Sequence, residues 1–294
     1  MRSKSKIAVP LLAALAVAGT FITVMPGGEG DGSVAVNKPA VSQEPAAKAY
    51  VGNPDDPATW KLPVEAYMPT QAETRLLSSS RDEAIKNCMA NSGYPDWKPA
   101  PDLPPVRGET LTDWRYGIHE IDQATKNGYH PDPGRQAAYE ATLAADESMN
   151  ADQDVLRNCA TQTDAAGLLV QQSPLISEIN GNSYEKATES AAVKKIFALW
   201  SACMRDKGFT YREPMDASDH FMAGTDEVSA AEKRTAVADV ECRERHRVQQ
   251  IWFEAEVAIQ QQEIAGRLND LKRHRAAVKA AVAGARSTAQ GATR

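Results

Sequence analysis

The stretch CMANSGY at residues 88–94 decides the fold, because the chain repeats its pattern as CMRDKGF at residues 203–209. Both copies fit C-M-x3-G-aromatic-x4-P, which ends at Pro99 in the first copy and at Pro214 in the second. Glycine takes the left-handed conformation in which many helices end, and the proline prevents the helix from resuming. The methionine and the aromatic residue occupy the two positions that touch across a Schellman cap. The repeat therefore predicts two helices with the same C-terminal cap.

The segment that leads into the second copy has the pattern of an amphipathic helix. Its apolar residues recur at steps of three and four, as on a helix with one buried face. These residues are Val193, Ile196, Phe197, Trp200, Cys203 and Met204. The pattern predicts a helix over residues 184–207. The cap itself does not require a cysteine, so Cys203 is either a small buried hydrophobe or one half of a disulfide.

The composition bounds the class of protein. The chain has 294 residues, a formal charge of −6 and a hydrophobic fraction of 42%, which is enough for one large or two small domains. Its mean hydropathy of −0.46 argues against a polytopic membrane protein. An acidic chain is also a poor candidate for nucleic-acid binding, because phosphates attract cations.

The first residues have the pattern of an export signal. Three cations, Arg2, Lys4 and Lys6, precede an apolar stretch at residues 7–25. Residues 1–26 are therefore either a cleaved signal peptide or a retained N-terminal membrane anchor, and both alternatives stay open. Both predict that the rest of the chain is extracytoplasmic, either secreted or anchored to the outer face of the cytoplasmic membrane.

Export bears on the four cysteines. In an oxidising compartment four cysteines imply two disulfides, for which three pairings exist. The repeated pattern favours Cys88–Cys159 and Cys203–Cys242, because each bridge then lies within one copy's own module. On the chain-entropy model each bridge stabilises the fold by about 4 kcal/mol.

Shifts in composition divide the chain further. Residues 27–58 are rich in Gly, Pro, Ala, Ser and Asp and predict a flexible linker. A first helical module is expected at residues 59–180 and a second at residues 181–271, with a loop at residues 180–183 between them. Residues 272–294 are basic and rich in Ala and predict a tail that projects from the fold.

Helix signals outnumber strand signals in both modules. Thr70 and Glu73 form a capping box for a first helix, and shorter helices are expected near residues 119–126, 135–149 and 155–170. No run of β-branched residues alternates with period two. The predicted fold class is all-α, a disulfide-stapled helical domain with two related Cys-Met-x3-Gly modules and a long C-terminal helix.

The long C-terminal helix is expected to begin at a second capping box, Ser229 with Glu232. Nothing in the sequence breaks it before Gly266, and some 50 helical residues would span roughly 75 Å. Its apolar stripe includes Trp252 and Ile259, and these two residues are the predicted contact surface for a partner. The charged run at residues 241–247 is interpreted as a solvated helix face.

No constellation with a recognisable chemistry emerges. His119 and Glu120 begin like the helix of zinc peptidases, but position 123 is Gln where the second histidine ligand should stand. Cys242 and His246 share a helix face, but a disulfide would consume the cysteine and zinc needs more ligands. No nucleophile elbow and no phosphate-binding loop is present in the sequence. We therefore assign no catalytic residue, no metal and no cofactor.

Several short stretches together resemble a group of actinobacterial exported proteins of uncharacterised function. The similarity covers roughly residues 62–270, and its order is more specific than any single piece. The pieces are Leu62–Tyr67, Asn87–Met89 with Gly93 and Tyr94, Trp114–Ile118, Gly128–His130, Trp200–Gly208 and Ala238–Cys242. The resemblance implies a cell-envelope location and no established activity. Similar proteins accompany envelope transport or peptidoglycan-associated components, which implies a partner of that kind.

Three functions remain as hypotheses. The first is a non-enzymatic structural or interaction module that acts by contact outside the membrane. The second is a secreted enzyme whose site gathers His119, His130 or His220 with carboxylates. The third is a small-molecule binding module with an aromatic groove. The aromatic residues proposed for that groove are Trp97, Trp114, Tyr116 and Tyr129.

Overall fold

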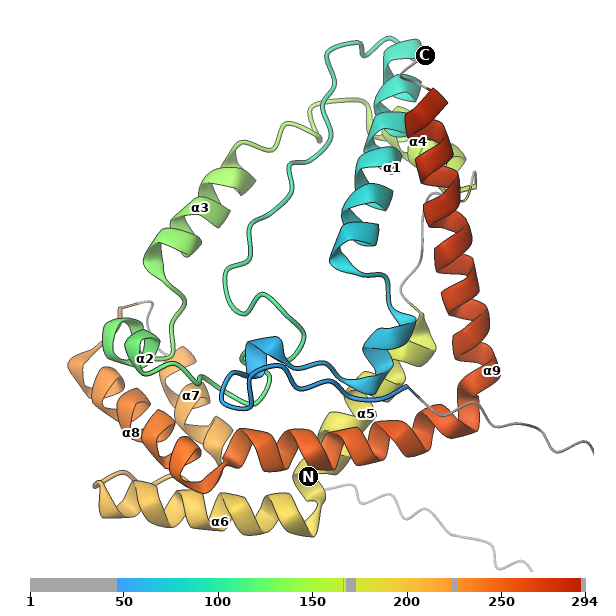
Figure 1. Cartoon of the computed structure of the whole chain (residues 1–294). Coiled ribbons are helices and arrows are strands. Elements are labelled where there is room, and N and C mark those ends of the chain that lie inside the picture. Colours follow the sequence, from blue (N-terminus) through green and yellow to red (C-terminus); the bar gives the residue numbers. More distant parts are fainter. Residues whose placement is uncertain (1–46, 166, 168–172, 224–226, 292–294) are drawn as a thin grey trace, which may run out of the picture. The chain divides into compact units, whose positions relative to one another are not determined.

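Figure 1 shows the computed structural model of the chain, which describes residues 47–165, 167, 173–223 and 227–291. Within these ranges the regular structure is helical, and the one extended pairing is an isolated bridge between Tyr50 and Lys61. The predicted all-α class is therefore confirmed. The predicted leader at residues 1–26 and the linker up to residue 46 lie outside the described residues.

The helices follow one another with short connections, apart from the long segment between the first two α-helices. Their bounds are η1 (Pro57–Thr59), η2 (Pro63–Tyr67), α1 (Gln71–Asn91), α2 (Ile121–Asn127), α3 (Pro133–Ala144), α4 (Gln153–Ala165), α5 (Pro174–Glu189), α6 (Ala191–Asp206), α7 (Pro214–Met222), α8 (Ala230–His246) and α9 (Val248–Gly291). None of these described helices is both long and apolar enough to cross a membrane.

Both predicted Schellman caps are confirmed. Gly93 after α1 has a φ of 98° and Gly208 after α6 has a φ of 91°, values in the left-handed region. In the first cap, the backbone N–H of Tyr94 donates to the Met89 carbonyl at 2.9 Å. The N–H of Phe209 donates to the Met204 carbonyl at the same distance of 2.9 Å in the second. The repeated sequence pattern therefore gives the same local structure twice.

The two predicted disulfides are also confirmed. Cys88–Cys159 joins α1 to α4, and Cys203–Cys242 joins α6 to α8. No free cysteine remains in the chain. Each bridge connects a helix that ends in a Schellman cap to a second helix, so the cysteine and the cap of each repeat fix the same helix end.

The predicted helix over residues 184–207 is in fact two helices. The chain breaks at Ser190, whose ψ is 148°, because the Ser190 side chain accepts a hydrogen bond from the Val193 N–H and caps α6. The predicted loop at residues 180–183 is wrong, since these residues lie inside α5. Ser183 is fully buried there, and tertiary packing overrides the loop preference of the Asn-Gly-Asn sequence.

The predicted uninterrupted C-terminal helix is also divided. Arg247 takes a left-handed conformation with a φ of 53° and separates α8 from α9. A second irregularity, at Arg267 with a φ of −129°, kinks α9, and Figure 1 shows the change of direction. The Ser229 cap forms as predicted, but the Glu232 carboxylate bonds to the Tyr129 N–H instead of closing a capping box.

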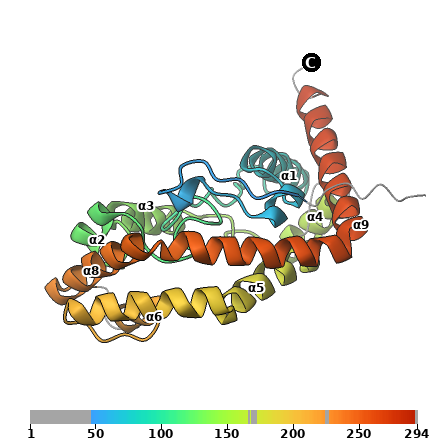
Figure 2. The ribbon, with the colours of Figure 1, turned by 60° about the horizontal axis from the view of Figure 1, so that its bottom comes forward.

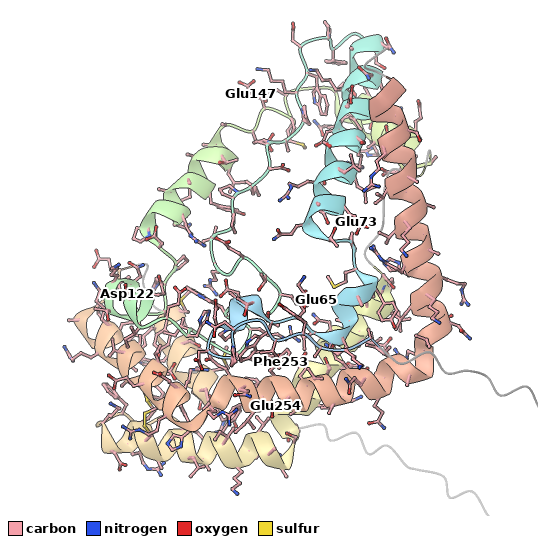
Figure 3. All side chains as sticks on the ribbon, in the orientation of Figure 1. Glu65, Glu73, Asp122, Glu147, Phe253 and Glu254 are labelled. Carbon is pink, nitrogen blue, oxygen red and sulfur yellow. A yellow bond between two sulfur atoms is a disulfide. The ribbon has the colours of Figure 1, made fainter. Side chains whose placement is uncertain are left out.

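The predicted tail does not project. Residues 272–291 continue α9, and the buried side chains of Val278, Val282 and Ala285 pack with Leu77 of α1. Arg275 of the same half of α9 forms an ion pair with Glu73 of α1 at 2.9 Å. Figure 3 shows Glu73 at the start of α1, on the side that faces α9. An Ala-rich face suits such close packing because it has no long side chains to displace.

Part of the predicted flexible linker is ordered. Within residues 47–58 the bridge from Tyr50 to Lys61 and the helix η1 have formed. The indole N–H of Trp60 also donates to the Asn53 carbonyl at 2.8 Å. The prediction of a linker was therefore wrong for these residues, because a buried tryptophan fixes the segment despite its polar composition.

The main core forms around the first half of α9. Figure 2 shows this half running alongside α5 and α6, and Trp252 lies fully buried between them. The rings of Tyr184 and Phe197 lie 5.1 Å and 4.9 Å from that of Trp252. Segments of both predicted modules share this packing, since η2 contacts α9 and α2 contacts α8, and Val64 and Tyr129 belong to the main core. The predicted boundary at residue 180 falls inside α5.

Candidate functional site

Charged side chains lie inside the helical packing at three places, and they are the strongest candidates for chemistry. The first is centred on Glu256 of α9, which has no exposed surface. Arg115 reaches its carboxylate with Nε at 3.0 Å and Nη2 at 2.5 Å. The hydroxyls of Tyr116 and Ser183 donate to it at 2.7 Å and 2.9 Å. Burial and the neighbouring carboxylate raise the pKa of Tyr116, so the phenol stays a donor.

The second buried group is the ion pair between Asp239 and Arg243, one turn apart on α8. Arg243 Nε donates to Asp239 at 2.7 Å, and both side chains are at most 1% exposed. The guanidinium also donates to the carbonyls of Tyr116 and Pro214, while the Trp200 indole donates to Asp239 at 2.8 Å. The carboxylate and the guanidinium thus each have several hydrogen-bond partners, which is the condition for burying such a pair.

The third buried group pairs His130 with Glu232. The Nδ1 atom of His130 lies 2.8 Å from Glu232 Oε1, and the Tyr129 N–H donates to the same oxygen at 2.9 Å. The Glu232 side chain is 2% exposed. The pair joins the turn after α2 to α8, and the Tyr129 hydroxyl adds a bond to Asp239 at 3.2 Å. The arrangement fixes α2 against α8 and leaves little room for a substrate at the carboxylate.

Of the predicted histidines, His119 borders a cavity in the part of the chain that the structure describes. A cavity of about 360 Å³ is lined by His119, Trp60, Arg247 and neighbouring residues. The Nε2 atom of His119 lies 2.9 Å from Asp113, and Nδ1 lies 3.9 Å from Asp56. Burial alone would raise the pKa of Asp113, but hydrogen bonds from His119 and from the Glu109 amide bring the pKa below its usual value. Both ring nitrogens of His119 thus face carboxylates.

A second cavity, of about 460 Å³, is also lined by residues of the segment between α1 and α2. Trp114 lines it together with Glu109, Glu120 and Arg135, and other polar residues complete it. Trp114 takes a φ of 59°, which is unusual for a residue that is not glycine. Arg135 pairs with Glu109 at 2.9 Å, so two of the charges at this cavity neutralise each other.

The predicted histidine and aromatic clusters do not assemble. His119 and His130 bind different acids, and His220 is exposed and packs beside the rings of Tyr211 and Phe221. Of the four aromatic residues proposed for a groove, Trp97, Tyr116 and Tyr129 are buried, whereas Trp114 borders a cavity. The described residues hold no group of three or more His, Cys, Asp or Glu side chains placed to bind a metal ion.

The predicted contact residues behave differently from each other. Trp252 is fully buried in the main core, so its ring contacts the chain's own helices and is not accessible to a partner. The prediction that Trp252 contacts a partner is therefore wrong. Ile259 is half-buried at the edge of the same core, and its contact with a partner stays a prediction.

The sequence reading missed the buried charges. The charge pattern predicts a solvated face for Arg243, but this residue is 1% exposed, whereas Glu241, Glu244 and Arg245 around it are exposed as expected. One signal was available, since Asp239 and Arg243 are four residues apart and have Val240 and Cys242 between them. Arg115 and Glu256 gave no signal, because their pairing joins segments far apart in the sequence.

The segment between α1 and α2 thus lines two cavities, and the buried charged groups bond within the chain. A comparison with models of protein families, with curated proteins and with solved structures finds no significant match to this chain.

Proposed function

We propose that this chain is an extracytoplasmic protein of the cell envelope that acts by contact with a partner and carries out no reaction of its own. The observation that carries the proposal is the way its buried ionisable groups are used. Glu256, Asp239 and Glu232 each accept bonds from several side chains or amides of the same chain. A general base needs a free lone pair within reach of a substrate proton, and these carboxylates have no such access.

The location rests on the disulfides. Two bridges suggest an oxidising environment, because thiols in the cytoplasm are kept reduced. The finer proposal, that the protein is secreted or held at the outer face of the cytoplasmic membrane through residues 1–26, rests on the sequence of those residues. A partner associated with envelope transport or with peptidoglycan fits this location.

The enzyme hypothesis is less well supported. His119 would be its base, but Nε2 is bound by Asp113 at 2.9 Å and Nδ1 faces Asp56 at 3.9 Å. A substrate would therefore have to displace Asp113 to reach Nε2 of His119.

One observation favours small-molecule binding as a second candidate function. Trp114 combines a left-handed backbone with a place in the wall of the cavity of about 460 Å³, and strained residues are more common at binding sites than elsewhere. Isothermal titration of soluble envelope sugars and amines against the full chain and a Trp114→Ala variant tests this candidate. Binding that disappears in the variant would favour it over a protein partner.

The main proposal is tested by photo-crosslinking in living cells. A photoreactive amino acid at exposed Glu254 and, separately, at half-buried Ile259 should give crosslinks to the same envelope protein, identified by mass spectrometry. Cell fractionation and non-reducing peptide maps of the same material should show an exported chain with both disulfides. A chain that stays in the cytoplasm with reduced cysteines would contradict the location, and crosslinks that reach only its own peptides would contradict the contact function.

A further inference from the structure

An apolar groove runs along α8 where this helix lies between α2 and the end of α6. Figure 1 shows the three helices, and α8 contacts both of the others. The groove is shallow and wide open to solvent, with a volume of about 470 Å³. Its lining includes Val237 and Ala238 of α8, Thr125 of α2, and Phe209, which follows α6. The face therefore combines side chains from three elements that are distant in sequence.

The groove is held rigid on the side of α6. The Cys203–Cys242 disulfide joins α6 to α8 with the two Cα atoms 5.8 Å apart. The Schellman cap fixes the residues that follow, since the Phe209 N–H donates to the Met204 carbonyl at 2.9 Å. Phe209 is half-buried and packs against the main core, so its ring keeps one side toward the groove. A preformed groove loses little conformational entropy when it binds a ligand.

The rim of the groove is basic although the whole chain is acidic. Lys207, Lys233 and Arg234 line it together with a single carboxylate, Glu241, which pairs with Lys207. No carboxylate of the described residues pairs with Lys233 or Arg234. Both cations lie in the second turn of α8, near the end where the helix dipole is also positive. Positive potential therefore concentrates at one end of an apolar surface.

We propose that this groove binds an acidic peptide segment of a partner protein, with an apolar side chain over Val237 and carboxylates on Lys233 and Arg234. The proposal rests on the contact function proposed above and names the surface and the chemistry of the partner. The charges are complementary, because the rim offers two unpaired cations within the described structure. A peptide also supplies backbone N–H donors for the Glu241 carboxylate, which an acyl chain does not.

A random peptide library displayed on phage tests the proposal on the oxidised full chain. Selected peptides should share an aromatic or aliphatic residue flanked by Asp or Glu. A synthetic peptide with the consensus should then bind at least about tenfold more weakly to the Lys233→Glu/Arg234→Glu double variant, because attraction becomes repulsion. Thr125→Trp should have a similar effect by filling the groove from an exposed position.

The matched control is the Lys194→Glu/Lys195→Glu double variant, which reverses two adjacent cations on α6 outside the groove lining. It should bind the peptide as the unchanged protein does. Circular dichroism of every variant separates loss of binding from loss of fold. A consensus without acidic residues, or equal binding by all variants, would overturn the proposal.

Vesicles that contain anionic phosphatidylglycerol distinguish a lipid from a peptide. If vesicles bind through Lys233 and Arg234 while no selected peptide does, the groove binds a lipid surface and the proposed peptide is wrong. The proposed contact function and the proposed groove are contradicted by different results. Crosslinking at Glu254 or Ile259 that captures an envelope protein regardless of Lys233 and Arg234 would leave that function standing and remove only the groove.

Discussion

Glu256 is a carboxylate inside the core that is held by hydrogen bonds from Arg115, Tyr116 and Ser183. Figure 3 labels Glu254, the exposed residue two positions earlier on the same helix. Glu256→Gln removes the charge that Arg115 faces at 2.5 Å and should destabilise the protein by about 3–5 kcal/mol, as when one partner of a buried pair is lost. Glu254→Gln should change the stability by less than about 0.5 kcal/mol. Urea unfolding followed by tryptophan fluorescence measures both, and equal midpoints would contradict the assignment of Glu256 as a structural charge.

Alanine variants at two glycines separate the cost of backbone strain from the cost of steric overlap. Gly93 and Gly117 have φ values of 98° and 92°, so alanine is strained at both positions. A Cβ at Gly93 meets nothing within 4 Å, whereas a Cβ at Gly117 overlaps the buried guanidinium of Arg243. Gly93→Ala should lower the free energy of unfolding by about 1–2 kcal/mol. Gly117→Ala should cost clearly more, because Arg243 cannot move without leaving Asp239 unpaired.

Thermal unfolding of both glycine variants checks this order. A cost for Gly117→Ala no greater than that for Gly93→Ala would mean that Arg243 has room to shift. The Asp239–Arg243 pair would then be less tightly held than its burial indicates.

At the scale of elements, local signals predicted the helix ends and missed the helix breaks. The caps at Gly93 and Gly208 depend on residues within one turn of each other, so seven-residue patterns were sufficient. The break at Ser190 has a local cause that the sequence analysis did not use, since the serine side chain caps α6. The break at Arg247 has no such signal, because a non-glycine residue takes the left-handed conformation there. The buried charges were missed for the same reason, because Arg115 becomes a core residue only when α9 brings Glu256 to it.

The contact between α1 and the second half of α9 should depend on pH. A hydrogen bond from Arg275, followed by one from the Thr70 N–H, lowers the pKa of Glu73 from 4.5 to about 2. A carboxyl group whose pKa is lower in the folded state stabilises the fold at pH values above its pKa in the unfolded state. This stabilisation is lost as the pH falls from about 4.5 toward 2. Glu73→Gln should remove the effect.

The measurement is the urea midpoint of the unchanged protein and of Glu73→Gln between pH 2 and pH 7. The difference between the two should be constant above about pH 5.5 and should shrink toward zero near pH 2. Glu83→Gln on the same helix is the control, since no ion pair holds Glu83 among the described residues. A difference that stays constant down to pH 2 would contradict the role of the Arg275 pair.

At the scale of the whole molecule, the two disulfides support cores of different size. Cys203 and Cys242 belong to the main core around Trp252, whereas Cys159 lies in a small separate cluster with Ile85, Met89 and Trp97. The bridges close segments of 71 and 39 residues, so the chain-entropy model gives each about 4 kcal/mol. A difference between the effects of losing each bridge must therefore come from the side chains that surround it. A small apolar cluster has less buried area to hold its helices when the bridge is gone.

We expect Cys88→Ala/Cys159→Ala to release α1 and α4 from each other while the main core stays folded. Hydrogen exchange should then rise in residues 80–99 and 151–165 and stay low in residues 248–264. Cys203→Ala/Cys242→Ala should instead lower the midpoint of a single global transition by an amount that corresponds to about 2–5 kcal/mol. Free thiols should be undetectable in the native protein. Four reactive thiols in native material would contradict both bridges. A uniform rise in exchange when Cys88 and Cys159 are removed would contradict the division, because the small cluster and the main core would then unfold as one unit.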